Sequence, residues 1–463
     1  MTDYPMPTAT QPLPRKTMML YALPHLTDAV MTLPMALFIP AFYSTELGLP
    51  LAGVGAMIAV SRILDVVADP LIGVVSDRLH TRWGRRKPWL VTGTPIIMLA
   101  TWMLFVPPGQ VSLTYLMIWA CLLSVGYSVF DLPYKAWGAE LSTNYAERSR
   151  ITAWREGFRA AGQFAFLAVL ILTGITSRHS GKNEMLAIAL MVVVGLPPLV
   201  TITLRLVPER PPERLVGQVL IGWSAMLSLF GNRAFLRTLV AIILFGSGLM
   251  VQVTLHKLVL THVIGRPEMF APLILGETLG SLAAMPLWIR LSDRIGKHRA
   301  VTLAALWVGL WSLPMPWLGA GDIVLYSALI ALRGSSFAAI FFLSNSIAAD
   351  VVDQDTLNTG KQRTGLFFAL WGMAIKLAGA LGVMMGTGLP AMFGFVPTAA
   401  GQTPSSISAL MQIYGWLPGL IMLFAFPLLW NFPIDEACHR KLRARIDERS
   451  GRQNIKPASD QKQ

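Results

Sequence analysis

The chain has 463 residues, of which 54% are hydrophobic and only 14% are charged, and its mean hydropathy is +0.55. A soluble domain carries about a quarter of charged residues, so this composition excludes an ordinary soluble protein. The net charge of +13 does not indicate a nucleic-acid-binding protein. The basic residues lie in short loops between apolar runs, where the positive-inside rule accounts for them.

Residues 1–17 are polar and Pro-rich and lack the apolar core of a secretory signal, so we expect a cytoplasmic tail. Apolar runs of roughly 20 residues then recur, each bounded by Gly, Pro or charges. They predict a six-helix bundle over 18–206, a cytoplasmic linker over 207–237, a second six-helix bundle over 238–432 and a basic cytoplasmic tail over 433–463. The twelve expected helices are 18–44, 51–76, 88–107, 112–137, 151–176, 184–206, 238–263, 268–290, 299–318, 322–348, 365–388 and 405–432.

These elements predict an all-α membrane protein, because only helices satisfy their backbone groups in lipid at this density of spans. The motif Ser-Asp-Arg follows both the second and the eighth expected helix, in "GVVSDRLHTRWGRRK" and "IRLSDRIGKHR". This repeat predicts two parallel six-helix halves, which resemble the major facilitator fold. Lys and Arg gather in the loops after the second, fourth and eighth helices, in the linker and in the C-terminal tail. We therefore expect both termini in the cytoplasm of a multi-pass protein of the cell membrane.

The expected helix 51–76 carries three charges on one face. Arg62, Asp65 and Asp69 fall within an arc of roughly 60° on a helix. Charges at this depth must face the bundle interior or water. Two carboxylates one turn apart offer oxygen ligands to Na⁺, or a site that shares a proton. The alternative is a structural network, but Arg62 cannot balance two carboxylates, so we expect a cation-binding site.

The expected helix 112–137 ends with Asp131, Pro133 and Lys135. Pro133 bends the helix and frees a carbonyl near Asp131. Asp131 is therefore a candidate third carboxylate for the cation and a candidate ligand of the substrate. The alternative is an ion pair between Asp131 and Lys135, which lie one turn apart.

Two further helices offer charged groups to a polar substrate. Arg155 and Arg159 share one face of the helix 151–176, where a guanidinium can bind a hydroxyl pair or a carboxylate. The alternative is an Arg that reaches the membrane interface, which fits Arg159 better than Arg155. Asp28, in the helix 18–44, can accept hydrogen bonds from a polyol or can lie near the cytoplasmic interface.

Lys376 lies in the middle of the helix 365–388, with no acidic neighbour within two turns. A lone Lys at that depth needs a partner from another helix, and the carboxylates of the second and fourth helices are the candidates. Trp371 lies five residues earlier and is a candidate contact for a ring-shaped ligand. Glu277 and Arg333 add to the charge network of Arg62 and Lys376, either within it or as a separate structural pair.

The pairs Asp77–Arg78 and Asp293–Arg294 occupy matching loops of the two halves. We expect them to form salt bridges between the halves, as a cytoplasmic gate. The alternative is that these charges only set the topology.

Several segments resemble the glycoside–pentoside–hexuronide cation symporter family. They are "RILDVVADPLIGVVSDRLHTRWGRRKPW", "FDLPYKAWGAEL", "ERSRITAWR" and "ADVVDQDTLNTGKQRTGLFFALWGMAIKLAG". The resemblance implies a sugar-type substrate that is moved with Na⁺, Li⁺ or H⁺ by alternating access. It also implies that Asp65 and Asp69 bind the cation, that Asp131 lies near sugar and cation, and that Lys376 contacts these acids.

The resemblance places Arg155 and Asp28 close to the substrate residues of the fifth and first helices. The chain departs from the family pattern at "YALPHLTD", which replaces a Gly-rich segment, and at Lys135, which replaces an aromatic residue. Together with Arg155 and Arg333, Lys135 favours an anionic ligand such as a hexuronide. The alternative is a proton-coupled carrier or exporter of an amphiphilic, lysolipid-type or other organic anion.

No nucleophile elbow, metal motif or Gly-rich phosphate loop occurs in a loop long enough to hold an enzyme site, so we expect a transporter and not an enzyme. Cys121 and Cys438 are far apart and indicate neither a disulfide nor a metal site. We expect a small-molecule substrate, a surrounding lipid bilayer, no cofactor other than a coupling ion (Na⁺ or H⁺), no nucleic acid, and a functional monomer.

Overall fold

The computed structural model of the chain describes residues 13–79, 81–142, 145–173, 181–209, 229–359, 364–398 and 402–432. The predicted C-terminal tail, most of the predicted N-terminal tail and the centre of the predicted linker lie outside the described residues. Within the described ranges the regular elements are helices joined by turns and loops, with one isolated bridge between Thr81 and Gly84.

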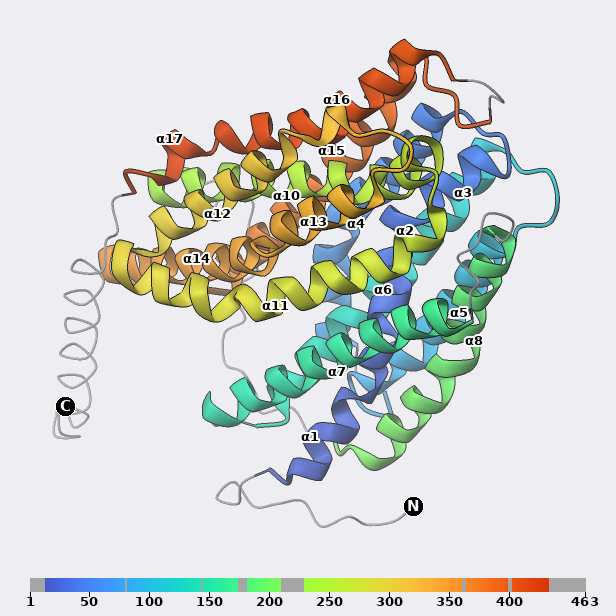
Figure 1. Cartoon of the computed structure of the whole chain (residues 1–463). Helices are drawn as coiled ribbons and strands as arrows, with labels where there is room; N and C mark the ends of the chain where they lie inside the picture. The colour runs from blue at the N-terminus through green and yellow to red at the C-terminus, as the bar shows by residue number, and fades with distance from the viewer. Residues whose placement is uncertain are drawn as a thin grey trace, which may run out of the picture.

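The helices divide in chain order into a first half, α1–α8, and a second half, α10–α17. Figure 1 shows the first half at the lower right and the second half across the upper left. The first half contains α1 (Arg15–Ala22), η1 (Leu23–Leu26), α2 (Asp28–Leu37), α3 (Ile39–Thr45), α4 (Leu51–Arg78), α5 (Lys87–Phe105), α6 (Leu113–Glu140), α7 (Tyr145–Leu172) and α8 (Gly181–Leu206). The second half contains α10 (Arg233–Val259), η2 (Leu260–Ile264), η3 (Pro267–Met269), α11 (Phe270–Ile295), α12 (Lys297–Ser312), η4 (Met315–Trp317), α13 (Ile323–Gly334), α14 (Phe337–Thr359), α15 (Thr364–Met392), α16 (Pro404–Leu423) and α17 (Phe426–Leu429).

Ten helical spans in the described part of the chain are long and apolar enough to cross a membrane. The bent pair Arg15–Leu37 and Ile39–Thr45 brings this number to eleven if it forms one span. These eleven correspond to eleven of the expected helices. The remaining expected helix, 151–176, corresponds to α7, which carries Arg155, Glu156 and Arg159 near its middle.

Local sequence explains where several helices start and bend. The two helices of the bent pair meet at an angle of 48°, and Pro40 lies in the first turn of α3, where its missing N–H breaks the hydrogen-bond ladder. Ser112 and Asn232 cap α6 and α10, because their side chains accept hydrogen bonds from the backbone N–H groups of the first turn.

The two ends of the bundle differ in the charge of their loops. The basic end carries the Arg-rich segment 78–87, and the opposite end carries the loop 46–50. One buried apolar cluster runs through the first half and continues into the second half at the opposite end, through residues such as Leu255, Phe270 and Tyr326. A second cluster belongs entirely to the second half. The two halves therefore share a core at the opposite end.

Close contacts between the halves also lie toward the opposite end. α4 packs against α15, and α7 packs against α11. A Cβ atom added to Gly55 of α4 would lie 1.6 Å from Thr387 Oγ1 of α15, so only glycine allows this approach. Gln163 of α7 donates a hydrogen bond to Thr278 of α11 at 3.3 Å.

Candidate functional site

Lys376 of α15 reaches across to the two carboxylates of α4. Its Nζ atom forms an ion pair with Asp69 and lies 3.9 Å from Asp65 Oδ2. Two hydroxyl groups of α6 complete the group, because Ser124 donates to Asp65 at 3.0 Å and Ser128 donates to Asp69 at 2.7 Å. The predicted partnership of Lys376 with the second-helix acids is present in the structure.

This acid–lysine group is balanced in charge. Arg62 lies 3.8 Å from Asp65, so two cationic groups face two carboxylates. Its hydrogen bonding is incomplete, since the Oδ1 atom of Asp65 is buried without a hydrogen-bond partner. Asp65 is 2% exposed, whereas the side chains of Asp69 and Lys376 are 19% and 26% exposed. The group thus runs from a buried carboxylate to a more accessible one, and a bare carboxylate oxygen is a ligand that Na⁺ or a proton can use.

Asp28 is held by three polar side chains from other turns and helices. Arg159 Nε donates to Asp28 Oδ2 at 2.7 Å, and the hydroxyl of Tyr127 donates to Asp28 Oδ1 at 2.6 Å. His25 Nδ1 lies 3.7 Å from the same oxygen. The carboxylate is buried, but the side chain of Arg159 is 47% exposed. Asp28 therefore anchors a guanidinium that remains accessible.

Of the two alternatives considered for Arg159, the bond to Asp28 supports a position inside the bundle. The bond to Asp28 holds Arg159 near the middle of α7, away from either helix end. Arg155, one turn earlier, pairs with its neighbour Glu156 at 3.1 Å and is 16% exposed on its side chain. Two guanidiniums thus lie on the same stretch of α7.

Asp131 pairs with Lys135 on its own helix, at 2.6 Å. This is the intrahelical alternative considered from the sequence. Among the described residues there is no group of three acidic, His or Cys side chains arranged to hold a metal ion, so Asp131 does not join Asp65 and Asp69 as a third carboxylate in this structure. Lys135 remains 45% exposed on its side chain.

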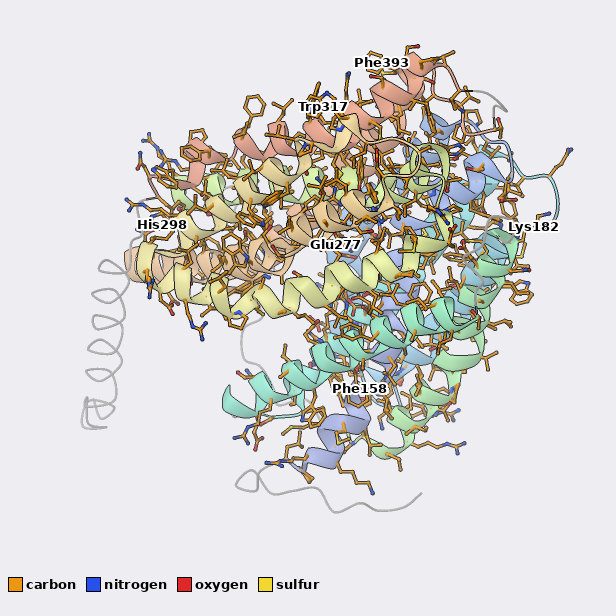
Figure 2. The ribbon with its side chains drawn as sticks, viewed as in Figure 1. Phe158, Lys182, Glu277, His298, Trp317 and Phe393 are labelled. Carbon is orange, nitrogen blue, oxygen red and sulfur yellow. The ribbon has the colours of Figure 1, made fainter. Side chains whose placement is uncertain are left out.

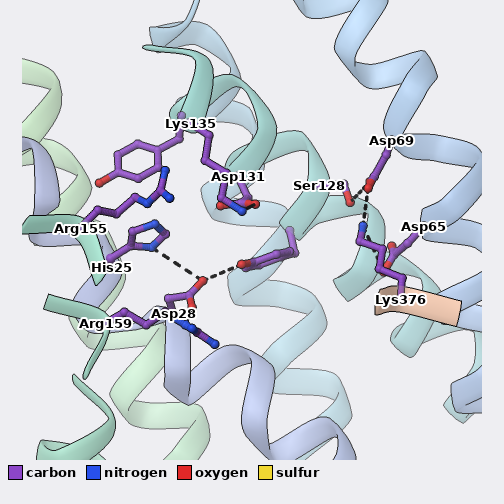
Figure 3. Close-up of polar contacts among 12 residues, drawn as sticks. His25, Asp28, Asp65, Asp69, Ser128, Asp131, Lys135, Arg155, Arg159 and Lys376 are labelled. Atoms are coloured by element: carbon purple, nitrogen blue, oxygen red, sulfur yellow. Dashed lines mark hydrogen bonds and ion pairs between the residues drawn. The ribbon is translucent and has the colours of Figure 1, made fainter. Parts of the chain in front are cut away.

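Helix α6 connects the Asp28 group to the acid–lysine group. Tyr127 bonds Asp28, and the next residue, Ser128, bonds Asp69. Figure 3 shows the two groups on either side of the segment that carries Asp131 and Ser128. A shift of α6 would therefore act on both groups at once.

Glu277, Arg333 and Trp371 lie apart from these groups. Glu277 and Arg333 form a pair at 3.5 Å inside the second half, and Arg333 is 1% exposed. Arg333 is therefore no accessible cation for a ligand, which corrects that part of the sequence interpretation. Trp371 is 4% exposed and donates from Nε1 to Asn345 Oδ1 at 2.7 Å, so it packs in the core of the second half and does not present its ring to a ligand.

The predicted gate between the halves is not formed by Asp77 in this structure. Asp77 pairs with Arg86 at 2.7 Å, and Arg86 also binds Glu140 at 2.6 Å, all within the first half. Burial lowers the pKa of Arg86, but the hydrogen bond with Glu140 raises it, and the result is a raised pKa. Asp293 and Arg294 are exposed at the end of α11.

An ion pair joins the halves at the opposite end instead. Lys257 of α10 pairs with Glu184 of α8, and its Nζ atom lies 4.6 Å from the ring centre of Phe38. The sequence alone did not indicate this pair, because its two residues are 73 positions apart. Buried Glu184 lies in the first turn of its helix, where it also resembles an ordinary helix-start acid.

Comparison with known proteins identifies the family of the chain. A model described as MFS/sugar transport protein matches residues 20–436. The chain belongs to this family. It is therefore a major facilitator of the symporter type that the sequence resemblance indicated, and a transporter rather than an enzyme.

Three curated relatives illustrate the range of this symporter family. The glucuronide carrier protein homolog of Escherichia coli is 26% identical and covers 89% of this chain and 91% of its own. The putative glycoside/cation symporter YagG of the same species is 26% identical, over 86% and 87%. The human sodium-dependent lysophosphatidylcholine symporter 1 is 24% identical, over 84% and 79%. Two of these names, those of YagG and of the lysophosphatidylcholine symporter, state cation-coupled transport.

Solved structures support the fold of the symporter. The nucleoside transporter NupG superposes with a TM-score of 0.65 at 16% identity and covers 91% of this chain and all (100%) of its own. The D-xylose-proton symporter gives a TM-score of 0.65 at 12% identity, over 91% and 98%. The chain is a multi-pass integral protein of the cell membrane with the major facilitator fold, and it moves a small molecule.

Proposed function

We propose that this protein is a symporter that couples the entry of a sugar or glycoside, preferably an acidic one, to Na⁺ or H⁺ by alternating access. The observation that carries the proposal is the group in which Lys376 of the second half binds Asp65 and Asp69 of the first half. A cation that binds these acids competes with Lys376, and thereby acts on the contact between the halves.

The proposed topology has twelve spans in two six-helix halves, 18–206 and 238–432, joined by a cytoplasmic linker over 207–237. α7 supplies the twelfth span: its 28 residues reach about 42 Å, which exceeds the hydrocarbon thickness. The charged middle of α7 then faces the interior and not lipid. The Lys and Arg residues at the basic end support a cytoplasmic position for that end and for both termini.

In the proposed coupling site, Asp65 and Asp69 supply carboxylate oxygens, and Ser124 and Ser128 supply hydroxyl oxygens. The unpartnered Oδ1 of Asp65 supports this assignment. When a cation binds, the cation and Arg62 together neutralise the two acids. The acids then attract Lys376 less strongly, and Lys376 can move away. Cation and substrate must then raise each other's affinity by the same factor.

In the proposed substrate site, Asp28 positions Arg159, and Arg155, Lys135 and Asp131 lie nearby. Arg159 and Lys135 are the exposed cations of this region, with 47% and 45% of their side chains accessible. A sugar carboxylate can accept two parallel bonds from a guanidinium. The name of the glucuronide carrier homolog is consistent with an acidic sugar.

The gate proposal is retained in a changed form. Asp77, Arg78, Asp293 and Arg294 are proposed to meet across the halves when the basic end closes, and Asp77 would then exchange its contact with Arg86 for one with the second half. The ion pair between Lys257 and Glu184 closes the opposite end and would separate in that step. The protein is proposed to act as a monomer.

The test is counterflow in proteoliposomes, with a panel of neutral sugars, hexuronides and lysophosphatidylcholine, in the presence and absence of Na⁺. Asp69→Asn should abolish the stimulation by Na⁺ or by a proton gradient. The matched control is Asp322→Asn, because Asp322 is an acid in a turn whose side chain accepts a hydrogen bond from the nearby backbone N–H of Gly319. Exchange of every substrate that ignores both the cation and Asp69→Asn would remove the coupling proposal.

Substrate charge is tested separately with Arg159. Arg159→Gln should lower the exchange of a hexuronide by at least tenfold, the loss of one charge-assisted contact, while exchange of a neutral sugar falls less. Equal losses for both substrates would contradict an acidic sugar. Exchange of lysophosphatidylcholine alone would replace the sugar proposal with an amphiphilic substrate.

A further inference from the structure

Five buried side chains of the second half form a polar network that the proposed coupling site does not use. They connect four helices, α10, α11, α13 and α16. Four of them are at most 1% exposed, and the fifth, Glu277, is 9% exposed. Figure 2 places Glu277 partway along α11, inside the second half. The members of the network are His256, Glu277, Tyr326, Arg333 and Tyr414.

Most hydrogen bonds of this network do not involve Glu277. Arg333 Nη2 donates to the Tyr414 hydroxyl at 3.1 Å. The hydroxyls of Tyr414 and Tyr326 lie 2.9 Å apart, and each is close to His256 Nδ1, at 3.0 and 3.1 Å. The guanidinium of Arg333 also lies 5.1 Å from the ring centre of Tyr414 and 5.9 Å from that of Phe337. Arg333 therefore has partners for its charge besides a carboxylate.

Glu277 depends on a much weaker contact. Its Oε1 atom lies 3.5 Å from Arg333 Nη2, and this oxygen is buried with no hydrogen-bond partner. Nε and Nη1 of Arg333 and Nε2 of His256 are likewise buried without partners. A buried carboxylate that is only loosely paired is costly to keep charged. A bound proton removes this charge and gives the group an O–H donor.

We propose that Glu277 is a proton-binding site in the second half, separate from the acids of α4. One proton from water converts the carboxylate into the neutral acid and raises the charge of the network by one. Arg333 then keeps Tyr414 and the two aromatic rings as its partners. The charged and titratable groups that face this site are Arg333 and Tyr326 on α13, Tyr414 on α16 and His256 on α10.

The position of the network connects it to the closure between the halves. His256 precedes Lys257, which pairs with Glu184 of the first half. Glu277 precedes Thr278, which accepts the hydrogen bond from Gln163 of α7. Two helices of the network thus carry inter-half contacts at adjacent residues. Proton binding at Glu277 shifts Arg333 relative to α11, and it should therefore loosen the closure at the opposite end.

The first test uses infrared difference spectra of the full-length protein in lipid nanodiscs, with carbon-13-labelled glutamate. We expect an isotope-sensitive C=O band of a protonated glutamic acid that rises as the pH falls. Glu277→Gln should remove the band, whereas Glu184→Gln, which also neutralises a buried acid, should retain it. The absence of such a band in the unmodified protein at every pH, or its survival in Glu277→Gln, would overturn the proposal.

The second test measures the closure itself. Spin labels at positions 182 and 393 lie on different halves at the opposite end, at exposed sites (Figure 2). The distance between the two labels, measured by double electron–electron resonance, should lengthen at low pH. Glu277→Gln should give the long distance at every pH. Glu277→Asp should restore the dependence on pH. If the distance between the labels changed neither with pH nor in Glu277→Gln, Glu277 would have a structural role only. This test does not depend on whether Na⁺ stimulates transport through Asp69.

Discussion

The contact between Gly55 and Thr387 allows a test of alternating access by a single methyl group. In Gly55→Ala the new Cβ would lie 1.6 Å from Thr387 Oγ1 and 2.7 Å from Thr387 Cβ, in the other half of the molecule. An added methyl in such a tight site costs about 1–3 kcal/mol. If the halves separate here during transport, the cost falls only on the state that is closed at the opposite end. The ratio of the two states should then change by about 5- to 150-fold.

Gly53 provides the matched control, since it lies two residues away on α4. A Cβ at Gly53 would also be overpacked, 2.6 Å from Leu113 Cδ1, but Leu113 belongs to the first half. Gly53→Ala should therefore lower stability without moving the equilibrium. Thr387→Ala should partly reverse the effect of Gly55→Ala, because it removes the closest atom.

The measurement is the distance distribution between spin labels at positions 182 and 393. We expect Gly55→Ala to transfer population from the short to the long distance, and Gly53→Ala to leave the distribution unchanged. A distribution in Gly55→Ala that matches the unmodified protein, together with an equal loss of stability in both variants, would refute the reasoning. The two halves would then not separate at Gly55.

Two further predictions concern single hydrogen bonds. Ser128→Ala removes the 2.7 Å bond to Asp69, which is worth about 1 kcal/mol, so half-maximal stimulation of counterflow should require roughly fivefold more cation; an unchanged requirement would remove Ser128 from the site. The carboxylate of Glu209 accepts hydrogen bonds from the backbone N–H groups of Arg85 and Arg86, both at 2.6 Å, just before α5. Glu209→Gln replaces this carboxylate with a neutral amide and so weakens both bonds. This variant should unfold at a lower temperature, by about 1–2 kcal/mol of stability, with unchanged cation dependence of counterflow, and an unaltered melting temperature would contradict it.

The sequence predicted the helices and the charged face of α4 because both depend on local pattern. Apolar runs separated by basic loops define spans, and the spacing of Arg62, Asp65 and Asp69 defines a face. The partner of Lys376 also followed, since a lone cation at that depth needs an acid and few acids are available. These inferences required no knowledge of how the side chains pack.

The contacts that were missed depend on tertiary packing between distant segments. Arg159 and Asp28 are 131 residues apart, and nothing in the sequence near Arg159 distinguishes a cavity-facing Arg from an interfacial one. Ser128 and Tyr127 are unremarkable polar residues in a helix, and they gain a role only because α6 lies between α1–α2 and α4. Trp371 was misassigned because its distance from Lys376 in sequence does not fix the direction of its ring.

The charge balance of the acid–lysine group leads to a prediction for Lys376→Ala. Asp65 and Asp69 carry two negative charges, and Arg62 and Lys376 carry two positive charges within 4 Å of them. A fifth charge from Na⁺ is therefore opposed while Lys376 remains. Two unit charges about 4 Å apart interact by about 4 kcal/mol at an effective dielectric constant of 20. Solvent screens part of this, since Lys376 is 26% exposed.

Removal of Lys376 should therefore strengthen Na⁺ binding by roughly ten- to hundredfold, and at the same time abolish the stimulation of transport by Na⁺. Binding can be followed by the thermal stability of the purified protein in a Na⁺ titration, because a ligand that binds only the folded state raises its stability. Lys376→Arg, which keeps the charge, should bind Na⁺ no more tightly than the unmodified protein. If Lys376→Ala bound Na⁺ more weakly, Lys376 would be a support of the cation site and not its competitor. Coupling would then have to depend on another contact between the halves, of which the pair Lys257–Glu184 is the first candidate.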